Sequence, residues 1–407
     1  MSADADSRRR REWPGSGLDV AALRAAGVAP VPLRQVVLKI AARCDLDCSY
    51  CYVYSLQDTG WRDRPRLMAP STVRAVAARI REHASTHQLP EVSVVFHGGE
   101  PLLAGVQTIT RACADLRSVV GEATELTFAL QTNGVRLDEA MLTAADREHI
   151  FISVSMDGPR ESHDRFRVHR DGRGSFDRVD AALRLLASDR YRHLFGGLLA
   201  VIDIDADPVG TYRALLEYQP PTVDFLLPFA NWTHPPRQPH AAESATPYGD
   251  WLAALFEHWY ASPQPRTPVR ILEETLQLML GGIGGTEVIG LAPATSVVVE
   301  TDGSIEQTGG LRAAYDGASA TDHTVFGSSF DDLLETPELA ARQGGEAVLA
   351  AECRSCEWLS VCGGGHYAHR YSAGAGFLRQ SVYCSDLKAL FARMAVLISG
   401  DLRATTS

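Results

Sequence analysis

The 407-residue chain lacks two features that would point to common classes of partner. Its 39 Lys and Arg residues are outnumbered by 50 Asp and Glu residues, giving a formal net charge of −11. Non-specific nucleic-acid binding needs a basic face, so this balance argues against a nucleic-acid partner. The sequence has no apolar run of about 18 or more residues, so no membrane-spanning helix is predicted.

The N-terminal segment also lacks the apolar stretch of an export signal. Arg8–Arg11 has the look of a twin-arginine signal, but Glu12, Trp13 and Pro14 follow it and no hydrophobic region does. We interpret residues 1–32 as a variable, partly disordered lead-in. The eight cysteines fall at metal-ligand spacings, which favours a reducing cytoplasm over a disulfide-forming compartment.

Alternating strand and helix patterns over the first 230 residues predict an α/β fold with a parallel sheet. The first predicted helix has Ser71 as its N-cap and apolar residues at the 3.6-residue period. Ligands of such folds gather at the C-terminal ends of the strands. The predicted strands are 36–42, 92–97, 126–131, 150–156, 197–204 and 223–228, and the clearest later helices are 176–187 and 209–218.

A loop rich in Pro and polar residues, 231–247, predicts a break after the sixth strand. Helical patterns follow at 248–261 and 269–280, and a strand and turn are predicted at 296–303. We therefore divide the chain into the lead-in, a core at 33–245, a helical linker at 246–294 and a C-terminal domain at 295–400.

Three cysteines fall within eight residues directly after the first predicted strand: Cys44, Cys48 and Cys51. Thiolates are soft ligands suited to iron–sulfur clusters or zinc. A structural zinc site usually has four protein ligands, and no fourth Cys or His lies nearby. A disulfide would leave one of the three unpaired. In a four-iron cluster, three thiolates leave one iron open to a small molecule.

Short polar motifs follow the next three predicted strands. They are Gly98-Gly99-Glu100-Pro101, Gln131-Thr132-Asn133-Gly134 and Ser155-Met156-Asp157-Gly158. Each alone is an ordinary turn signal. Their recurrence at successive strand ends, with Arg167 shortly after the last, indicates a ligand site.

A second group of cysteines lies near the C-terminus. Cys353, Cys356, Cys362 and Cys384 supply four thiolates, enough to close either a zinc site or a four-iron cluster. The remaining cysteine, Cys113, falls on a helical pattern and is predicted to pack as a small buried hydrophobe.

The C-x3-C-x2-C spacing of the first group, with Tyr50 before its third cysteine, resembles the radical S-adenosylmethionine (SAM) superfamily. The resemblance implies that a [4Fe–4S] cluster binds SAM at its open iron. It also implies that Glu100 binds the SAM ammonium, Arg167 the carboxylate and Ser155 the ribose. The other implied SAM contacts are Tyr50, Gly98, Gly99, Pro101, Gln131 and Asn133.

The second cysteine group resembles the SPASM domain of peptide-modifying radical SAM enzymes. That domain carries C-x2-C-x5-C-x3-C, and here His366 stands at the fourth position. The upstream cysteines are also missing, since Glu306-Gln307-Thr308 contains none. The resemblance thus implies one auxiliary cluster on Cys353, Cys356, Cys362 and Cys384, and two [4Fe–4S] clusters per chain. The implied fold is a partial (β/α)6 TIM-like barrel with a C-terminal SPASM-type domain.

Three longer stretches, 97–105, 224–228 and 362–371, narrow the resemblance to FxsB-type radical SAM/SPASM peptide maturases. It implies a ribosomally made precursor peptide as substrate and a ferredoxin or flavodoxin-type reductant. SAM is cleaved to a 5′-deoxyadenosyl radical, which removes a hydrogen from a β-carbon. That carbon then joins an aromatic ring, forming a cyclophane. The ring regains aromaticity by losing a proton and an electron, with the auxiliary cluster as acceptor. Asp224, Asp302 and His366 are the candidate proton acceptors.

Two alternatives stay open. One is a different radical SAM modification of a peptide or protein: formylglycine formation, thioether bonding or epimerisation. The other is a non-catalytic iron–sulfur or zinc module, against which the strand-end motifs count.

Overall fold

The computed structural model describes residues 12–238 and 244–406. Arg8–Arg11, where an export signal was considered, lies outside the described residues. The described part of the lead-in packs on the C-terminal half of the chain. Helix α2 (Val20–Ala25) is held by Arg24, whose Nη2 donates to the Leu334 carbonyl at 2.7 Å. The Trp13 ring lies 6.4 Å from the ring of Tyr367.

A single sheet of nine strands forms the centre of the fold, in the order β6-β5-β4-β3-β2-β1-β7-β8-β9. Neighbouring strands from β1 to β6 are parallel, which confirms the predicted α/β fold. Strand β1 pairs with β2 on one side and with β7 on the other, so it has no free edge left for β6. The curved sheet is therefore open and does not close into a barrel. The six strands are β1 (Gln35–Ala41), β2 (Glu91–Gly98), β3 (Glu125–Thr132), β4 (Ile150–Ser155), β5 (Phe195–Val201) and β6 (Val223–Leu226).

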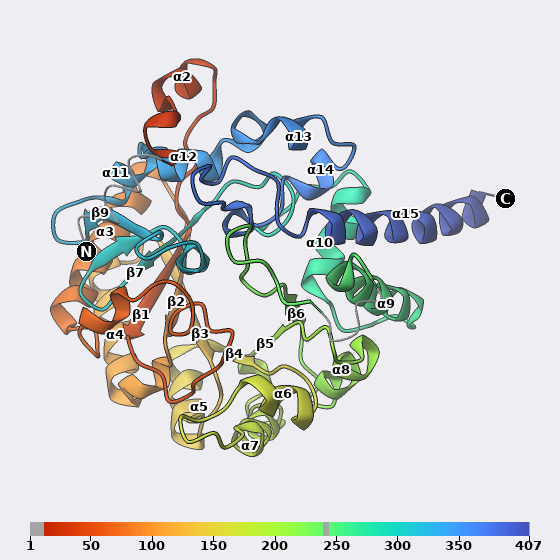
Figure 1. The fold of residues 1–407 in the computed structure, drawn as a ribbon. Coiled ribbons are helices and arrows are strands. Elements are labelled where there is room, and N and C mark those ends of the chain that lie inside the picture. Colours follow the sequence, from red (N-terminus) through yellow and green to blue (C-terminus); the bar gives the residue numbers. More distant parts are fainter. Residues whose placement is uncertain (1–11, 239–243, 407) are drawn as a thin grey trace.

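Helices follow these strands along the outer side of the curved sheet (Figure 1). The predicted N-cap at Ser71 is wrong, because the first of them starts at Pro70 and has Ala69 as N-cap. Proline suits a first helical position because its fixed φ matches the helix and its missing N–H has no partner there. The helices are α3 (Pro70–His87), α4 (Val106–Val120), α5 (Glu139–Glu148), α6 (Arg160–Phe166), α7 (Phe176–Leu186) and α8 (Pro208–Leu216).

The main core lies between the sheet and these helices. Strand residues such as Leu38, Phe96 and Ile152 are fully buried, as are helix residues at the 3.6-residue period. Cys113 on α4 is fully buried among them, as predicted. Burying each large apolar side chain contributes roughly 1.5–3 kcal/mol to folding, which fixes the strand ends that carry the polar motifs.

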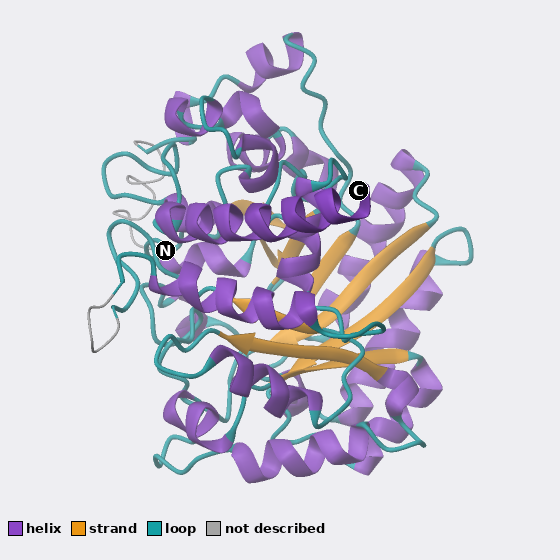
Figure 2. Ribbon diagram, turned by 90° about the vertical axis from the view of Figure 1, so that its right-hand side faces the viewer, coloured by secondary structure: helices purple, strands orange, loops and turns teal. Residues whose placement is uncertain are grey.

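The C-terminal half continues the same sheet on the other side of β1 (Figure 1). Figure 2 shows the strands surrounded by helices. Strand β7 (Ser296–Val299) runs parallel to β1, and β8 (Ser304–Glu306) and β9 (Ala320–Thr324) follow antiparallel. The remaining helices are α9 (Pro247–Ala261), α10 (Arg270–Met279), α11 (Phe330–Leu334), α12 (Pro337–Gln343), α13 (Ala351–Arg354), α14 (Leu359–Cys362) and α15 (Cys384–Thr406).

Helix α15 ties the end of the chain to the linker helices. The Asp386 carboxylate accepts hydrogen bonds from the backbone N–H groups of Tyr248 at 2.9 Å and Gly249 at 3.0 Å, in the first turn of α9. A carboxylate there also complements the positive end of the α9 dipole. Across the described residues, every helix is too short or too polar to span a bilayer.

Candidate active site

A cavity of about 300 Å³ lies where the parallel strands end. Residues at the ends of β2, β3, β4, β5 and β6 line it, including Gly98, Gln131, Ser155, Val201 and Leu226. This is the position predicted from the strand-end motifs, because parallel strands present their C-terminal ends at one edge of a sheet.

The three cysteines after β1 all line this cavity: Cys44, Cys48 and Cys51. Their loop is tightened by a hydrogen bond from the Cys51 N–H to the Cys48 carbonyl at 3.0 Å. Burial raises the pKa of the Cys48 thiol to about 12 and also raises the pKa of Cys44 and Cys51. A bound cation reverses this preference and holds the ligands as thiolates. The arrangement therefore fits three ligands of one metal cluster.

Two glycines at the end of β2 allow the cysteine loop to pack closely on that strand. The Gly99 N–H donates to the Ala41 carbonyl at 2.9 Å, and the Glu100 N–H donates to the Arg43 carbonyl at 2.9 Å. A Cβ on Gly98 would overlap the Ala41 carbonyl, and one on Gly99 would overlap that of Arg43. Glycine is therefore required here for contact between two chain segments.

The Glu100 side chain lies beneath the cavity and does not line it. It is fully buried, and its carboxylate accepts hydrogen bonds from the Leu102 N–H at 3.0 Å, the Thr132 hydroxyl at 2.7 Å and the Asn133 N–H at 2.8 Å. Burial raises its pKa to about 7, although the three donors favour the ionised form. The predicted contact of Glu100 with the SAM ammonium stays a prediction. Glu100 joins the ends of β2 and β3, and Pro101 is likewise absent from the cavity wall.

Three other predicted polar residues do face the cavity. The Gln131 side-chain amide donates to the Ser155 hydroxyl at 3.0 Å, which links the ends of β3 and β4. The Asn133 amide donates to the Asp45 carboxylate at 2.9 Å, next to Cys44. These contacts join the strand ends to the cysteine loop and form a polar half of the cavity.

Arg167 also lines the cavity, and a residue without a predicted role holds it in place. Asp157 receives two hydrogen bonds from its guanidinium, at 2.9 and 3.2 Å, and one from the Tyr50 hydroxyl. The guanidinium also lies 5.5 Å from the centre of the Tyr50 ring. The sequence alone indicates only an Asp-Gly turn at Asp157. Its position two residues after Ser155, at the end of β4, is the sequence feature that could have indicated a role in this site.

The three predicted proton acceptors lie outside the cavity wall. Asp224 is buried on β6 in an ion pair with Arg270, and Asp302, in the β7–β8 turn, pairs with Arg64 at 3.3 Å. The His366 Nδ1 accepts a hydrogen bond from the Ala368 N–H at 3.2 Å, and burial lowers its pKa to about 4.

His97, by contrast, does line the cavity, although it had been interpreted only as the last residue of a strand. Burial lowers its pKa to about 4, so the imidazole is neutral at pH 7.

The second cysteine group also comes together. Cys353, Cys356, Cys362 and Cys384 surround a small cavity of about 30 Å³ between α13, α14 and the start of α15. None of the eight cysteines, which all lie in the described part of the chain, forms a disulfide. The sulfurs are spaced more widely than the ligands of a single zinc ion, since no three of them lie within 4.8 Å of one another. Four sulfur ligands around one small space therefore fit a closed four-iron site, with no position left for substrate.

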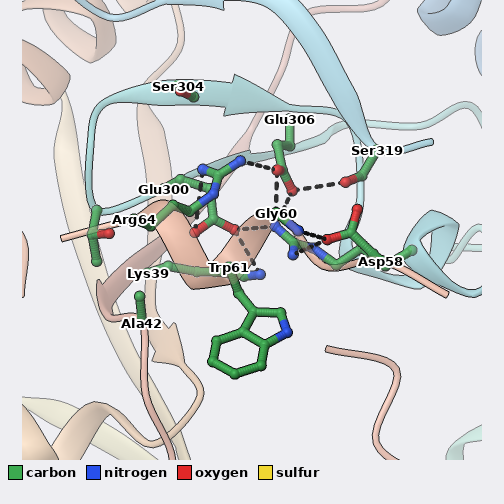
Figure 3. A network of polar contacts seen from close by, with 12 residues as sticks. Lys39, Ala42, Asp58, Gly60, Trp61, Arg64, Glu300, Ser304, Glu306 and Ser319 are labelled. Carbon is green, nitrogen blue, oxygen red and sulfur yellow. Dashed lines mark hydrogen bonds and ion pairs between the residues drawn. The ribbon is translucent and has the colours of Figure 1, made fainter. Parts of the chain in front are cut away.

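Charged side chains fill the region around Glu306 (Figure 3). In this segment the SPASM pattern has further cysteines and this sequence has none. The buried Arg312 contacts Glu300 at 2.7 Å, Glu306 at 2.8 Å and Asp58 at 3.0 Å. Lys39 contacts Glu300 at 2.7 Å. With Arg64 included, three cations match the three buried anions Asp58, Glu300 and Glu306, and Arg64 also pairs with the more exposed Asp302. Such pairing is how buried charges are tolerated. The network joins the segment after the cysteine loop to β7 and β8.

Comparisons with known proteins agree with this geometry. Residues 38–209 match the family model of the Radical SAM superfamily. The Cysteine-type anaerobic sulfatase-maturating enzyme of Clostridium perfringens (strain 13 / Type A) is 26% identical over 372 residues, covering 88% of this chain and 95% of the relative.

Two solved structures share the fold. The native anSMEcpe structure with bound AdoMet and Cp18Cys peptide superposes with a TM-score of 0.75 at 22% identity, covering 90% of this chain and 99% of that one. Streptococcus suis SuiB bound to precursor peptide SuiA has a TM-score of 0.56 at 14% identity, covering 89% and 78%. These likenesses extend beyond the sheet to the C-terminal half.

Proposed function

Since the chain is a radical SAM enzyme, we propose that it joins an aromatic ring carbon of a precursor peptide to the β-carbon of a nearby residue. Cys44, Cys48 and Cys51 would hold the SAM cluster. SAM would be held in the polar half of the cavity by Gly98, Gly99, Gln131, Asn133, Ser155 and Arg167. When bound, the cluster and SAM supply a carbon-centred radical that removes a hydrogen atom from the peptide.

The lining of the other half of the cavity carries this proposal. This half has an apolar wall, with Tyr52 beside it. The wall consists of Leu199 and Val201 on β5, Leu226 on β6 and the following Leu227-Pro228-Phe229. Within the described residues no carboxylate side chain lines the cavity. Such a wall suits aromatic and aliphatic side chains, which gain free energy on leaving water, and it keeps water away from a radical.

Two structural relatives support a peptide substrate. One solved relative was determined with a Cp18Cys peptide and another with its precursor peptide SuiA. A ferredoxin or flavodoxin-type protein would reduce the clusters. The apolar wall would hold the two peptide side chains close together, so that bond formation is intramolecular.

Formylglycine formation is a second candidate, favoured by the 26% identity to a sulfatase-maturating enzyme over most of both chains. That reaction oxidises a small polar Cys or Ser side chain. The apolar wall offers such a side chain few polar contacts, which is why the cross-link is placed first.

We expect the peptide product of the wild-type enzyme to be two hydrogens lighter than its substrate, because one carbon–carbon bond replaces two carbon–hydrogen bonds. The test is mass spectrometry, with a hydrazide reagent added, of candidate precursor peptides: short peptides with aromatic residues near the C-terminus, sought in the DNA that flanks the gene. A cross-link gives the mass loss without hydrazide labelling and without need of a cysteine. Labelling would show a formylglycine aldehyde, an unchanged mass would show epimerisation, and dependence on a cysteine would show a thioether.

We expect Arg167→Ala to weaken SAM binding about tenfold or more, because a charge-assisted hydrogen bond contributes roughly 1.5–3 kcal/mol. Equilibrium binding of SAM to the reconstituted enzyme measures this. The variant also leaves Asp157 buried without its partner, so thermal unfolding is measured in parallel and Arg167→Lys, which keeps the charge, is the folded comparison. Arg160→Ala, on the exposed side of α6, is the matched control. Unchanged SAM affinity in Arg167→Ala would refute the assignment.

A further inference from the structure

Four aromatic rings connect the cavity with the C-terminal cysteine site. Tyr52 lines the cavity and follows Cys51, and its ring centre lies 5.0 Å from that of Phe229. The Phe229 centre is 5.9 Å from that of His369, which is 4.9 Å from that of Tyr383. Tyr383 directly precedes Cys384. We call Tyr52, Phe229, His369 and Tyr383 the aromatic bridge.

The surrounding backbone holds the aromatic bridge in a fixed arrangement. The Tyr383 hydroxyl donates to the Pro228 carbonyl at 2.8 Å, directly before Phe229. On the other side lies the short helix η5 (Gly309–Ala313). A Cβ on Gly309 would overlap Tyr52, and one on Gly310 would overlap Phe229, so both positions need glycine to pack this closely. This helix directly follows Glu306-Gln307-Thr308, where the upstream cysteines of the SPASM pattern are missing.

The histidine in the aromatic bridge costs folding free energy that a purely structural cluster of rings would avoid. His369 is buried, and its Nε2 has no hydrogen-bond partner among the described residues. An unpaired buried polar atom costs free energy that Leu or Phe at the same place would avoid. Burial also lowers the pKa of His369 well below its usual value, so the ring is neutral at pH 7. The bridge thus offers a continuous, uncharged row of π systems between the two sites.

We propose that the aromatic bridge carries the electron that leaves the peptide to the cluster held by Cys353, Cys356, Cys362 and Cys384. This inference rests on the proposed cross-linking reaction. Once the new carbon–carbon bond has formed, the attacked ring is a radical that exceeds the aromatic product by one hydrogen atom, that is, by one proton and one electron. The carbon–hydrogen bond at the attacked carbon breaks, its proton leaves for bulk water outside the apolar wall, and the unpaired electron passes to the cluster. The cluster is reduced by one electron and the ring becomes aromatic again.

Packed rings provide this path because an electron tunnels faster through contiguous π systems and van der Waals contacts than across gaps. None of the four rings needs to be oxidised, since each only couples its neighbours. The same contacts explain how a chain with a single auxiliary cysteine site can still transfer electrons out of its cavity. The four side chains connect the cavity with that cysteine site.

The test compares His369→Leu, which removes the central ring, with His369→Phe, which restores one. His369 does not line the cavity, so both variants should cleave SAM at the wild-type rate. Phe256→Leu removes a buried ring on α9 outside the aromatic bridge and controls for lost packing. The readouts are 5′-deoxyadenosine by chromatography, peptide mass, and rapid-freeze EPR of organic radicals during turnover.

In His369→Leu we expect a peptide radical to accumulate in the EPR spectrum and the product two hydrogens lighter to be lost, with SAM cleavage retained. His369→Phe and Phe256→Leu should behave as wild type. Wild-type product yield and no radical accumulation in His369→Leu would overturn the bridge and leave the proposed function standing. Absence of the lighter product from the wild-type enzyme would overturn the proposed function, and the bridge with it.

Discussion

Replacing Cys44, Cys48 and Cys51 together by Ala is expected to abolish reductive cleavage of SAM. These three thiols line the cavity at the end of the sheet, and without them no iron would be held beside the predicted SAM contacts. The C-terminal cysteine site lies between other helices, so it should still bind its metal. Chromatography of 5′-deoxyadenosine, with iron analysis of the same sample, measures both effects.

Cys113→Ala is the matched control for this triple variant. Cys113 is fully buried on α4 and lies outside both cysteine sites, so its loss should leave SAM cleavage intact and affect packing alone. Formation of 5′-deoxyadenosine by the triple variant would show that the cluster assignment is wrong.

The second large effect concerns iron content. Seven of the eight cysteines divide into the cavity group of three and the C-terminal group of four, which predicts about eight irons per reconstituted chain. Cys362→Ala should lower the count toward about four and stop cross-linking, because a cubane then lacks one of its protein ligands. Iron and zinc are measured together by mass spectrometry of the metal content.

The iron content of His366→Ala is to be compared with that of Cys362→Ala. His366 stands where the SPASM pattern has a cysteine, and its Nδ1 already accepts a hydrogen bond from the Ala368 N–H. The region upstream is filled by the Arg312–Glu306 network in place of sulfur ligands. The iron count should therefore stay unchanged in His366→Ala. A wild-type count near twelve, a fall in iron on removing His366, or one zinc in place of the second cluster would contradict this account.

Local patterns were sufficient to predict the strands of the core. Apolar runs between turn residues define β1 to β6 to within a few residues of their observed ends, because each strand carries a row of buried side chains that gives it a clear apolar pattern. The pairing of β7 beside β1 joins segments about 260 residues apart, as in the Val36–Val297 register. No local periodicity encodes such a pairing, so the C-terminal domain was not expected to extend the same sheet.

The candidate site followed from the same principle, but the roles of its carboxylates could not be predicted from spacing. Parallel strands bring Gly98, Gln131 and Ser155 to one edge whatever their side chains do. The role of an individual carboxylate depends on which arginine reaches it. Asp224 is paired with Arg270, and Asp157 with Arg167. These partners come from other elements, so spacing alone could not separate the carboxylate that positions Arg167 from one free to accept a proton.

The most direct test of the central claim follows a deuterium atom. A peptide that the wild-type enzyme modifies is made with deuterated β-carbons and incubated with reconstituted enzyme, SAM and reductant. Mass spectrometry of the same reaction then reports 5′-deoxyadenosine and peptide together. Radical modification at a β-carbon predicts one deuterium transferred into 5′-deoxyadenosine, and a peptide that has lost that deuterium and one further hydrogen. Unlabelled 5′-deoxyadenosine with a peptide of unchanged mass would contradict it.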